Sequence, residues 1–171
     1  MPGIPTLRIA TADDAAAIAL LHAQSWRNAY RGVLQEAYLD HAVQAEREAL
    51  WQARLADGAD APLEVLLLES PAGLLGFACI RPDADPEWGP LIDNLHVQAA
   101  LRGSGLGRML MTAVQARIGS GQRHHLWVLA ANEAARGFYA RLGGREASTE
   151  IHPMPDGRDY PCLRVVWNPQ P

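Results

Sequence analysis

The sequence predicts an α/β fold with one mixed sheet, partly antiparallel and partly parallel, flanked by helices. Residues 63–69 and 74–81 are two apolar runs around a Pro-Ala-Gly turn, which is the signal of an antiparallel hairpin. Residues 91–118 then read as a strand, a glycine-rich loop and a helix, which is the signal of a βα unit. The chain has 171 residues, of which 49% are apolar, so we expect one domain over residues 1–171 with a substantial core.

The first third of the chain is predicted to contain a short strand and two helical regions. The strand spans residues 7–10. Thr11 then caps a helix that continues to about Tyr30, because acidic residues follow in its first turn. A second helical region covers about residues 36–55, and a loop rich in Asp, Gly and Pro follows over residues 57–62.

The middle of the chain is predicted to hold three strands and a helix. A proline-marked loop over residues 82–90 follows the hairpin and leads into a strand over residues 91–97. The helix after the glycine-rich loop stops at Gly119 and Gly121. Its apolar face repeats at helical spacing and consists of Leu106, Met109, Leu110, Ala113, Val114 and Ile118.

The last third is predicted to contain a buried strand over residues 125–130, a helix capped by Asn132, and two closing strands over residues 145–152 and 160–167. The predicted order of elements is therefore β-α-α-β-β-β-α-β-α-β-β.

Composition and charge exclude several classes of protein. The net charge is −4, so no basic field attracts nucleic acid, and no apolar run is long enough to span a membrane. The N-terminus lacks the charged leader and apolar segment of a secretory signal. Cys79 and Cys162 lie in apolar strand-like runs, where buried thiols are expected and neither a disulfide nor a metal site. We therefore expect a cytoplasmic protein without a membrane partner and without a metal.

The most informative stretch is the glycine-rich loop between Arg102 and Arg108. Gly103, Gly105 and Gly107 leave the backbone bare, so that a ligand can approach its N–H groups. The following helix adds unpaired N–H groups and the positive end of its dipole, which favours a phosphate. The alternative is a connection that is glycine-rich for backbone reasons alone.

The loop does not match the two common nucleotide-binding patterns. The chain contains no lysine, which the ATP- and GTP-binding loop requires, and Arg108 stands where the dinucleotide fingerprint needs its third glycine. The remaining pattern, Arg102-x-x-Gly105-x-Gly107, resembles motif A of the GCN5-related N-acetyltransferase (GNAT) family, which holds the pyrophosphate of acetyl-coenzyme A. The predicted order of elements also resembles the GNAT fold over nearly the whole chain.

Residues 132–144 resemble motif B of the same family, written as an Asn, a Phe-Tyr pair and a Gly-Phe pair. Here Gly144 replaces the final phenylalanine, and we expect this departure to cost packing. The resemblance implies that Asn132 holds coenzyme A and that Tyr139 protonates the departing thiolate. The alternatives are that Asn132 is only a helix cap and Tyr139 only a core aromatic residue.

The resemblance implies that the function is transfer of an acetyl group from acetyl-CoA, as cosubstrate, directly to a primary amine. In the family, a bulge splays the strand before the loop from the next strand, and the pantetheine arm pairs with its backbone. The residues implied to hold the cosubstrate are Leu95, His96, Val97, Arg102, Gly103, Ser104, Gly105, Leu106, Gly107, Arg108 and Asn132. Arg136, one turn after Asn132, is a further candidate for a phosphate contact, with a solvated surface arginine as the alternative.

The attacking amine must lose a proton, so a base is expected. Asp93 and His96 are the candidates on the strand, although their odd separation points them to opposite faces unless a bulge resets the register. The alternatives are that Asp93 pairs with an arginine, that His96 packs in the core, and that water carries the proton. Trp26 and Tyr30 resemble residues of a GNAT subgroup and are candidates for walls of the acceptor pocket or, alternatively, for core anchors.

The sequence does not identify the acceptor amine. We favour a small molecule, and a peptide N-terminus or a protein lysine stays open. Paired late strands often form dimers in the family, so a homodimer is also open. A second hypothesis is a CoA-binding sensor that has the same fold but no catalytic activity.

Overall fold

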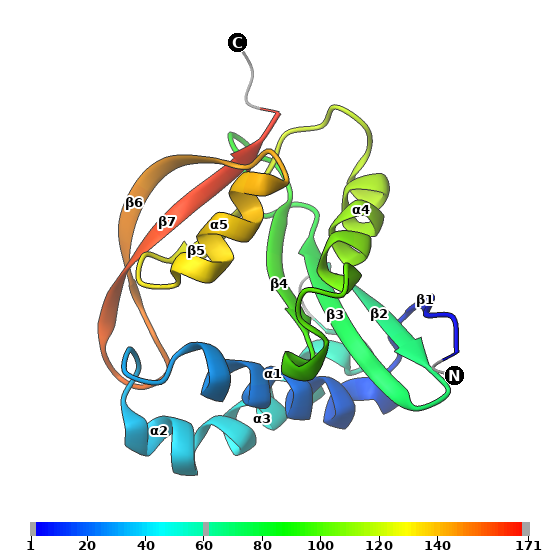
Figure 1. Ribbon diagram of the computed structural model, residues 1–171, viewed down its shortest axis with the longest axis vertical. Helices are drawn as coiled ribbons and strands as arrows, with labels where there is room; N and C mark the ends of the chain where they lie inside the picture. Colours follow the sequence, from blue (N-terminus) through cyan, green and yellow to red (C-terminus); the bar gives the residue numbers. More distant parts are fainter. Residues whose placement is uncertain (1–2, 60–61, 169–171) are drawn as a thin grey trace.

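In the computed structural model, which describes residues 3–59 and 62–168, seven strands form one sheet in the order β1-β2-β3-β4-β5-β7-β6 (Figure 1). Among the described strands, β4 and β5 are the one parallel pair. The strands are β1 (Thr6–Ile9), β2 (Glu64–Ser70), β3 (Gly73–Arg81), β4 (Leu91–Val97), β5 (His124–Leu129), β6 (Arg145–Pro153) and β7 (Asp159–Trp167). The helices are α1 (Ala15–Ala29), α2 (Glu36–His41), α3 (Val43–Leu55), α4 (Leu106–Ile118) and α5 (Glu133–Arg141), with 3-10 turns η1 (Ala12–Asp14) and η2 (Ala99–Leu101).

Helices cover both faces of the sheet, and α4 and α5 lie on the face opposite α1 and α3 (Figure 1). The alternation of side chains along a strand divides the core accordingly. Leu66 and Leu68 of β2 pack in the cluster that includes α4 and α5. Val65 and Leu67 pack in the cluster that includes α1 and α3. The near-continuous apolar run of β2 therefore reflects a strand that is buried on both faces.

The order of elements agrees with the sequence prediction, and most boundaries differ by one residue. The predicted helical region over 36–55 is two helices, because the backbone at Ala42 (φ −117°) departs from helical geometry between α2 and α3. Residues 60 and 61 of the predicted loop lie outside the described residues. Both cysteines are free and buried, as predicted. None of the described helices is long and apolar enough to cross a membrane.

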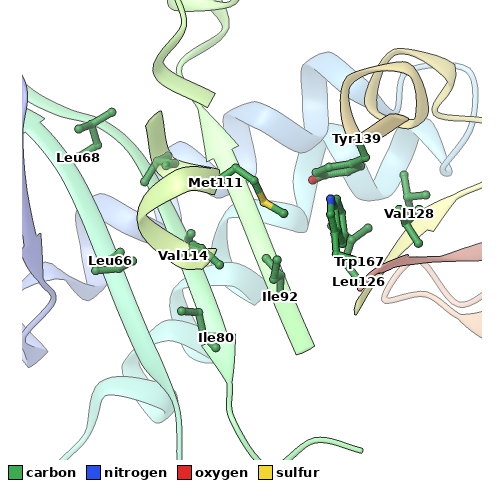
Figure 2. Close-up of a cluster of buried hydrophobic side chains, with 13 residues drawn as sticks. Leu66, Leu68, Ile80, Ile92, Met111, Val114, Leu126, Val128, Tyr139 and Trp167 are labelled. Carbon is green, nitrogen blue, oxygen red and sulfur yellow. The ribbon is translucent and has the colours of Figure 1, made fainter. Parts of the chain in front are cut away.

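The predicted apolar face of α4 is wrong at one position. Met109 is 41% exposed, whereas Met111 is buried against the sheet (Figure 2). Successive helical residues are rotated by about 100°. Because Met109, Leu110 and Met111 are all apolar, periodicity could not decide which methionine faces the core.

A β-bulge in β4 shapes the centre of the sheet. Cys79 of β3 lies opposite Asn94 and Ile80 lies opposite Ile92, so Asp93 is an extra residue in β4. A bulge bends and twists its strand. β4 and β5 accordingly pair in register only at Leu91 and His125, and they diverge beyond that point. The bulge and the splayed strand that the family resemblance implied are therefore both present.

Gly144 does not leave the packing defect that its replacement of phenylalanine suggested. A Cβ atom at this position would lie 2.6 Å from Val165 Cγ1 and 2.8 Å from Trp167 Cζ2. The indole of Trp167 is 4% exposed and donates a hydrogen bond from Nε1 to the carbonyl of Leu142 at 3.0 Å. A large side chain from β7 therefore fills the space, and the expected loss of packing was wrong.

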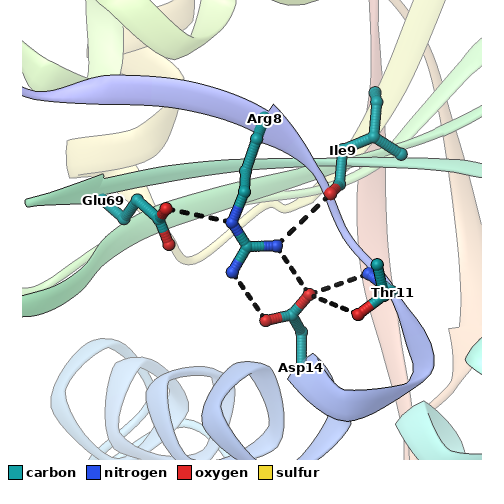
Figure 3. Close-up of polar contacts among 5 residues, drawn as sticks. All are labelled: Arg8, Ile9, Thr11, Asp14 and Glu69. Atoms are coloured by element: carbon teal, nitrogen blue, oxygen red, sulfur yellow. Dashed lines mark hydrogen bonds and ion pairs between the residues drawn. The ribbon is translucent and has the colours of Figure 1, made fainter.

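Arg8 connects β1, β2 and the start of the first helix (Figure 3). Its guanidinium donates two hydrogen bonds of 2.8 Å to the Asp14 carboxylate and one of 3.0 Å to Glu69. Asp14 also accepts a hydrogen bond from the N–H of Thr11 at 2.7 Å, which closes a capping box at η1. Hydrogen bonding from Arg8 lowers the pKa of Asp14 from 3.8 to about 2.

We expect Asp14→Asn to lower the free energy of unfolding by about 1 kcal/mol at pH 7, because it removes the ion pair and weakens the cap. A carboxyl group with a lowered folded-state pKa stabilises the fold above its unfolded-state pKa. The difference between wild type and variant should therefore shrink as the pH falls from 3.8 toward 2. Urea unfolding across this range measures it, and Asp13→Asn is the matched control. A difference that does not change with pH would contradict the assignment.

Candidate active site

The glycine-rich loop follows η2 and ends where α4 begins. Gly103 (φ +80°) and Gly105 (φ +87°) have left-handed backbone conformations that favour glycine. A Cβ atom at either position would meet no atom within 4 Å. The loop therefore presents its bare backbone to open space, as a ligand cradle requires.

The N–H groups of this loop are available to a ligand. Within the described part of the chain, no acceptor is hydrogen-bonded to the N–H groups of Gly103, Gly105, Leu106, Gly107 or Arg108. The first helical bond here runs from Met109 N to Gly105 O at 3.0 Å. These N–H groups stand at the positive end of α4. The start of the helix therefore offers a row of donors to an anion.

Arg102 and Arg108 flank these donors, and neither side chain makes an ion pair with a described residue. Both arginines are exposed. Ser104 instead closes the loop on itself, because its hydroxyl donates a hydrogen bond to the carbonyl of Leu101 at 2.5 Å. The loop thus combines two free cations with unpaired backbone donors, which is a suitable environment for a diphosphate.

The third glycine of the motif, Gly107, is required for a different reason, which is close packing between helices. A Cβ atom at Gly107 would lie 3.1 Å from Cζ of Phe138 on α5. Gly107 therefore allows α4 and α5 to approach each other closely, and it brings motif B to the side of the loop. The sequence interpretation counted this glycine among those that leave the backbone bare for a ligand.

The diverging part of β4 has a free backbone edge toward β5. Leu95 and Val97 direct their side chains into the core on the α4 face, and His96 directs its side chain toward α1 on the other face. Beyond Leu91, no described strand pairs in register with this edge. Backbone N–H and C=O groups need partners, so an extended chain could pair with β4 here.

Asn132 is the N-cap of α5, because its side chain accepts a hydrogen bond from the N–H of Ala135 at 3.2 Å. Its amide also contacts Tyr30. Burial raises the pKa of the Tyr30 phenol, and the contact with Asn132 opposes this rise. Tyr30 ends α1, and Asn132 begins α5, so the contact brings two segments distant in sequence to the same place.

Tyr139 of α5 is 8% exposed and belongs to the core cluster on the α4 side of the sheet. Its ring packs edge-on against Trp167, with 5.9 Å between ring centroids and 88° between planes. Figure 2 shows the ring lying over Trp167, with its hydroxyl directed toward Met111. Burial raises the pKa of this phenol, so the hydroxyl stays protonated at neutral pH and can donate its proton.

Arg136 is held in structural contacts. Its guanidinium donates to both carboxylate oxygens of Glu146, at 2.8 Å and 3.2 Å, and to the carbonyl of Ala130 at 2.9 Å. These bonds connect α5 to β6. A phosphate contact by Arg136 would require the ion pair with Glu146 to open.

Asp93 and His96, the two base candidates, both face the α1 and α3 layer because the bulge resets the register. Asp93 makes an ion pair of 2.6 Å with Arg54 of α3, and Asn94 accepts a hydrogen bond from the same guanidinium at 3.0 Å. This is the alternative in which Asp93 pairs with an arginine. The pair ties the bulge to α3.

His96 lies between β4 and α1. Its Nδ1 is hydrogen-bonded to the Ser25 hydroxyl at 2.8 Å, and its ring lies 4.6 Å from His22 and 5.3 Å from Phe77, measured between centroids. Burial, reinforced by the charges of Arg102 and Arg47, lowers the pKa of His96 to about 3. The imidazole is therefore neutral at physiological pH and is a weak base. The unperturbed pKa on which its candidacy rested does not apply.

Trp26 is a core residue, 8% exposed, with the Arg47 guanidinium 4.4 Å from its ring centroid. Tyr30 packs against Trp26 at 5.5 Å between centroids and lies nearer the surface. The roles of both in binding an acceptor stay predictions. Ser25 and Trp167, which sequence reasoning missed, support His96 and Tyr139. Their only sequence signal was an ordinary position on a helix or strand.

The site has no arrangement suited to a metal among the residues that the structure describes: no group of three or more His, Cys, Asp or Glu side chains is close enough to hold an ion.

Sequence comparison decides the family. The sequence model of a family described as "Acetyltransferase (GNAT) family" matches residues 23–144 of this chain. This range includes the end of α1, β4, the glycine-rich loop and α5. The chain belongs to the GNAT acetyltransferase family. No curated protein sequence matches the chain closely enough to add a more specific activity.

Solved structures agree with this GNAT fold. The PaiA N-acetyltransferase from Thermoplasma acidophilum, in complex with coenzyme A, is 14% identical with a TM-score of 0.71, covering 95% of this chain and 98% of that chain. A GCN5-related N-acetyltransferase from Rhodopseudomonas palustris is 21% identical with a TM-score of 0.72, covering 97% and 96%. YncA from Salmonella typhimurium, with its cofactor acetyl-CoA, is 20% identical with a TM-score of 0.65, covering 99% and 96%.

We expect Gly105→Val to reduce coenzyme A affinity by about tenfold or more, because the side chain enters the open space before the loop donors. Gly121→Val is the matched control: Gly121 (φ +75°) also faces open space but lies beyond the far end of α4. Both variants carry similar backbone strain, so calorimetric titration with coenzyme A separates strain from lost binding. Equal affinities for the two variants would contradict the cradle.

Proposed function

We propose that this GNAT protein is an N-acetyltransferase that moves an acetyl group from acetyl-CoA directly to a primary amine. The observation that carries the proposal is the set of unpaired N–H groups at Gly103 and at residues 105–108, beside the free edge of β4. The same fold could form with these N–H groups and this strand edge hydrogen-bonded within the chain. The structures of PaiA and YncA contain coenzyme A and acetyl-CoA, respectively, which supports the same choice of cosubstrate.

The residues present fit coenzyme A. The diphosphate would accept hydrogen bonds from the loop N–H groups, with Arg102 and Arg108 as counter-charges. The pantetheine arm carries amide groups, which suit the unpaired backbone of Leu95, His96 and Val97. Asn132 would contact the arm through an amide hydrogen, because its side-chain oxygen already accepts the cap bond from Ala135.

Bound acetyl-CoA would supply a thioester, and the chain would stabilise the charges that develop when the thioester is transferred. N–H groups of β4 would donate to the carbonyl oxygen, where negative charge first develops. Tyr139 would donate its phenolic proton to the departing sulfur. Its buried position keeps the proton on the phenol until negative charge develops on the sulfur beside it, and a proton from solvent would then restore the phenol.

The amine's proton is best assigned to water. Asp93 is occupied by Arg54, and His96 is a weak base in its buried position. Solvent that enters between α1 and the end of β4 can accept the proton without a charged side chain. Asp93 thus holds the bulge in place through its ion pair with Arg54, and His96 is hydrogen-bonded to Ser25.

Three further expectations accompany the proposal and stay predictions: one domain over residues 1–171, a cytoplasmic location, and a small-molecule acceptor. A homodimer stays open. A CoA-binding sensor without catalysis is the alternative function, and it predicts coenzyme binding without thiol release.

We expect Tyr139→Phe to lower kcat by at least about 100-fold while coenzyme A affinity changes little, because the phenol acts on the leaving group and not on binding. Release of free thiol from acetyl-CoA, measured with a panel of primary amines, gives kcat. Tyr38→Phe is the matched control, since it also removes a largely buried hydroxyl, here from α2.

Failure of the wild type to release thiol with every amine, despite tight coenzyme binding, would replace the proposal with the sensor. A Tyr139→Phe variant as active as wild type would keep the acetyltransferase and remove the assigned proton donor.

A further inference from the structure

The bulge in β4 is required by the apolar residues on either side of it. Ile92 and Leu95 both pack in the core on the α4 face of the sheet. Side chains of a regular strand alternate between the two faces, so residues three positions apart point to opposite sides. One extra residue between Ile92 and Leu95 is therefore needed to bury both. This pattern explains why a bulge exists, but it leaves the exact bend of the strand open.

One arginine of α3 contacts both residues on the other face of the bulge. Arg54 makes the ion pair of 2.6 Å with Asp93 and donates a hydrogen bond to Oδ1 of Asn94 at 3.0 Å. Consecutive residues of a regular strand point to opposite faces, so a single guanidinium could not reach both. It reaches both here because the bulge places two consecutive side chains on the same face. Arg54 therefore stabilises the bulged shape of β4 specifically.

The Arg54 side chain is itself held in place. Its guanidinium carbon lies 5.0 Å from the ring centroid of Trp51. Trp51 is fully buried and donates a hydrogen bond from Nε1 to Nδ1 of His22 at 2.9 Å. Arg81 of β3 lies 3.4 Å from the same oxygen of Asp93 that Arg54 contacts. Because the Arg54 side chain is only 14% exposed, breaking its ion pair would leave a largely buried charge without its partner.

The bend of β4 matters because the proposed coenzyme spans two elements. Its diphosphate would lie at the loop donors around Gly105, next to α4, which packs in the core. Its pantetheine arm would pair with the backbone of residues 95–97, which follow the bulge directly. The direction of these residues depends on the bulge. A small change in the bend would therefore move the strand away from the arm and leave the diphosphate site in place.

We propose that Arg54 is a positioning residue for the coenzyme, because it sets the bend at which the backbone of β4 meets the pantetheine arm. This inference rests on the proposed acetyltransferase function, which places coenzyme A at the loop and at β4. Arg54 lies on the opposite face of the sheet and would not touch the coenzyme. It acts through Asp93 and Asn94, and it affects the arm but not the diphosphate.

The test compares two ligands by calorimetric titration. One is coenzyme A, and the other is its nucleotide half, an adenosine diphosphate with the ribose phosphate but without the pantetheine arm. We expect Arg54→Met to weaken coenzyme A binding about tenfold or more and to leave the affinity for the nucleotide half unchanged. Arg54→Lys should give an intermediate loss, because an ammonium group keeps a charge for Asp93 but lacks the fork that also reaches Asn94.

Arg47→Met is the matched control. Arg47 is also a buried arginine of α3, and its guanidinium carbon lies 4.4 Å from the ring centroid of Trp26. Its guanidinium donates hydrogen bonds to Glu46 of the same helix. This variant should bind both ligands as the wild type does. Gly105→Val should instead weaken both ligands, because they share the diphosphate that the loop would hold.

Asn94→Ala is a milder variant that keeps the inference testable if Arg54→Met does not fold. It keeps the ion pair and removes only the hydrogen bond. It should therefore reduce coenzyme A affinity by a smaller factor, again without an effect on the nucleotide half. Wild-type affinity for coenzyme A in the Arg54 and Asn94 variants would overturn the inference. An equal loss for both ligands would also overturn it, because that result indicates general damage to the site.

The same titrations separate this inference from the proposed function. Failure of the wild type to bind coenzyme A would overturn both. Coenzyme A binding without thiol release from acetyl-CoA would overturn the proposed reaction alone, because the role of Arg54 requires only the bound coenzyme.

Discussion

Asp93 is the extra residue in β4, and its ion pair with Arg54 ties the bulge to α3. The bulge bends β4 away from β5, so the two halves of the sheet pair in register only at Leu91 and His125. Without this separation, β4 and β5 would satisfy each other's backbone groups, and no edge would remain for a ligand. The same extra residue turns His96 toward α1, where it meets Ser25.

The sheet halves that diverge at β4 and β5 are joined again by the loops around them. The carboxylate of Asp156, between β6 and β7, accepts hydrogen bonds from the N–H of Gln35 at 2.9 Å and from the Tyr160 hydroxyl at 2.5 Å. Tyr30 and Asn132 make contact nearby. These polar contacts connect the two halves of the sheet. They therefore hold β4 and β5 at a fixed separation where the strands themselves are not paired.

Local patterns predicted much of this molecule. The hairpin and the strand–loop–helix unit follow from residue types that act over a few positions. The bulge was expected only through the family resemblance, because register depends on the partner strand. The ion pair of Asp93, the close approach of Gly107 to Phe138 and the support of Tyr139 by Trp167 join residues that lie far apart in sequence. Single-sequence periodicity carries no information about such pairs, and it also could not choose between Met109 and Met111.

The contact between Gly144 and Trp167 has a consequence for how this sequence can change. The two positions share one volume beneath Tyr139, and the indole already occupies it. A bulkier residue at 144 can be accommodated only if the residue at 167 becomes smaller, so the energetic effects of the two substitutions cannot be additive. Homologous chains should therefore carry their large aromatic side chain at one of these positions and not at both.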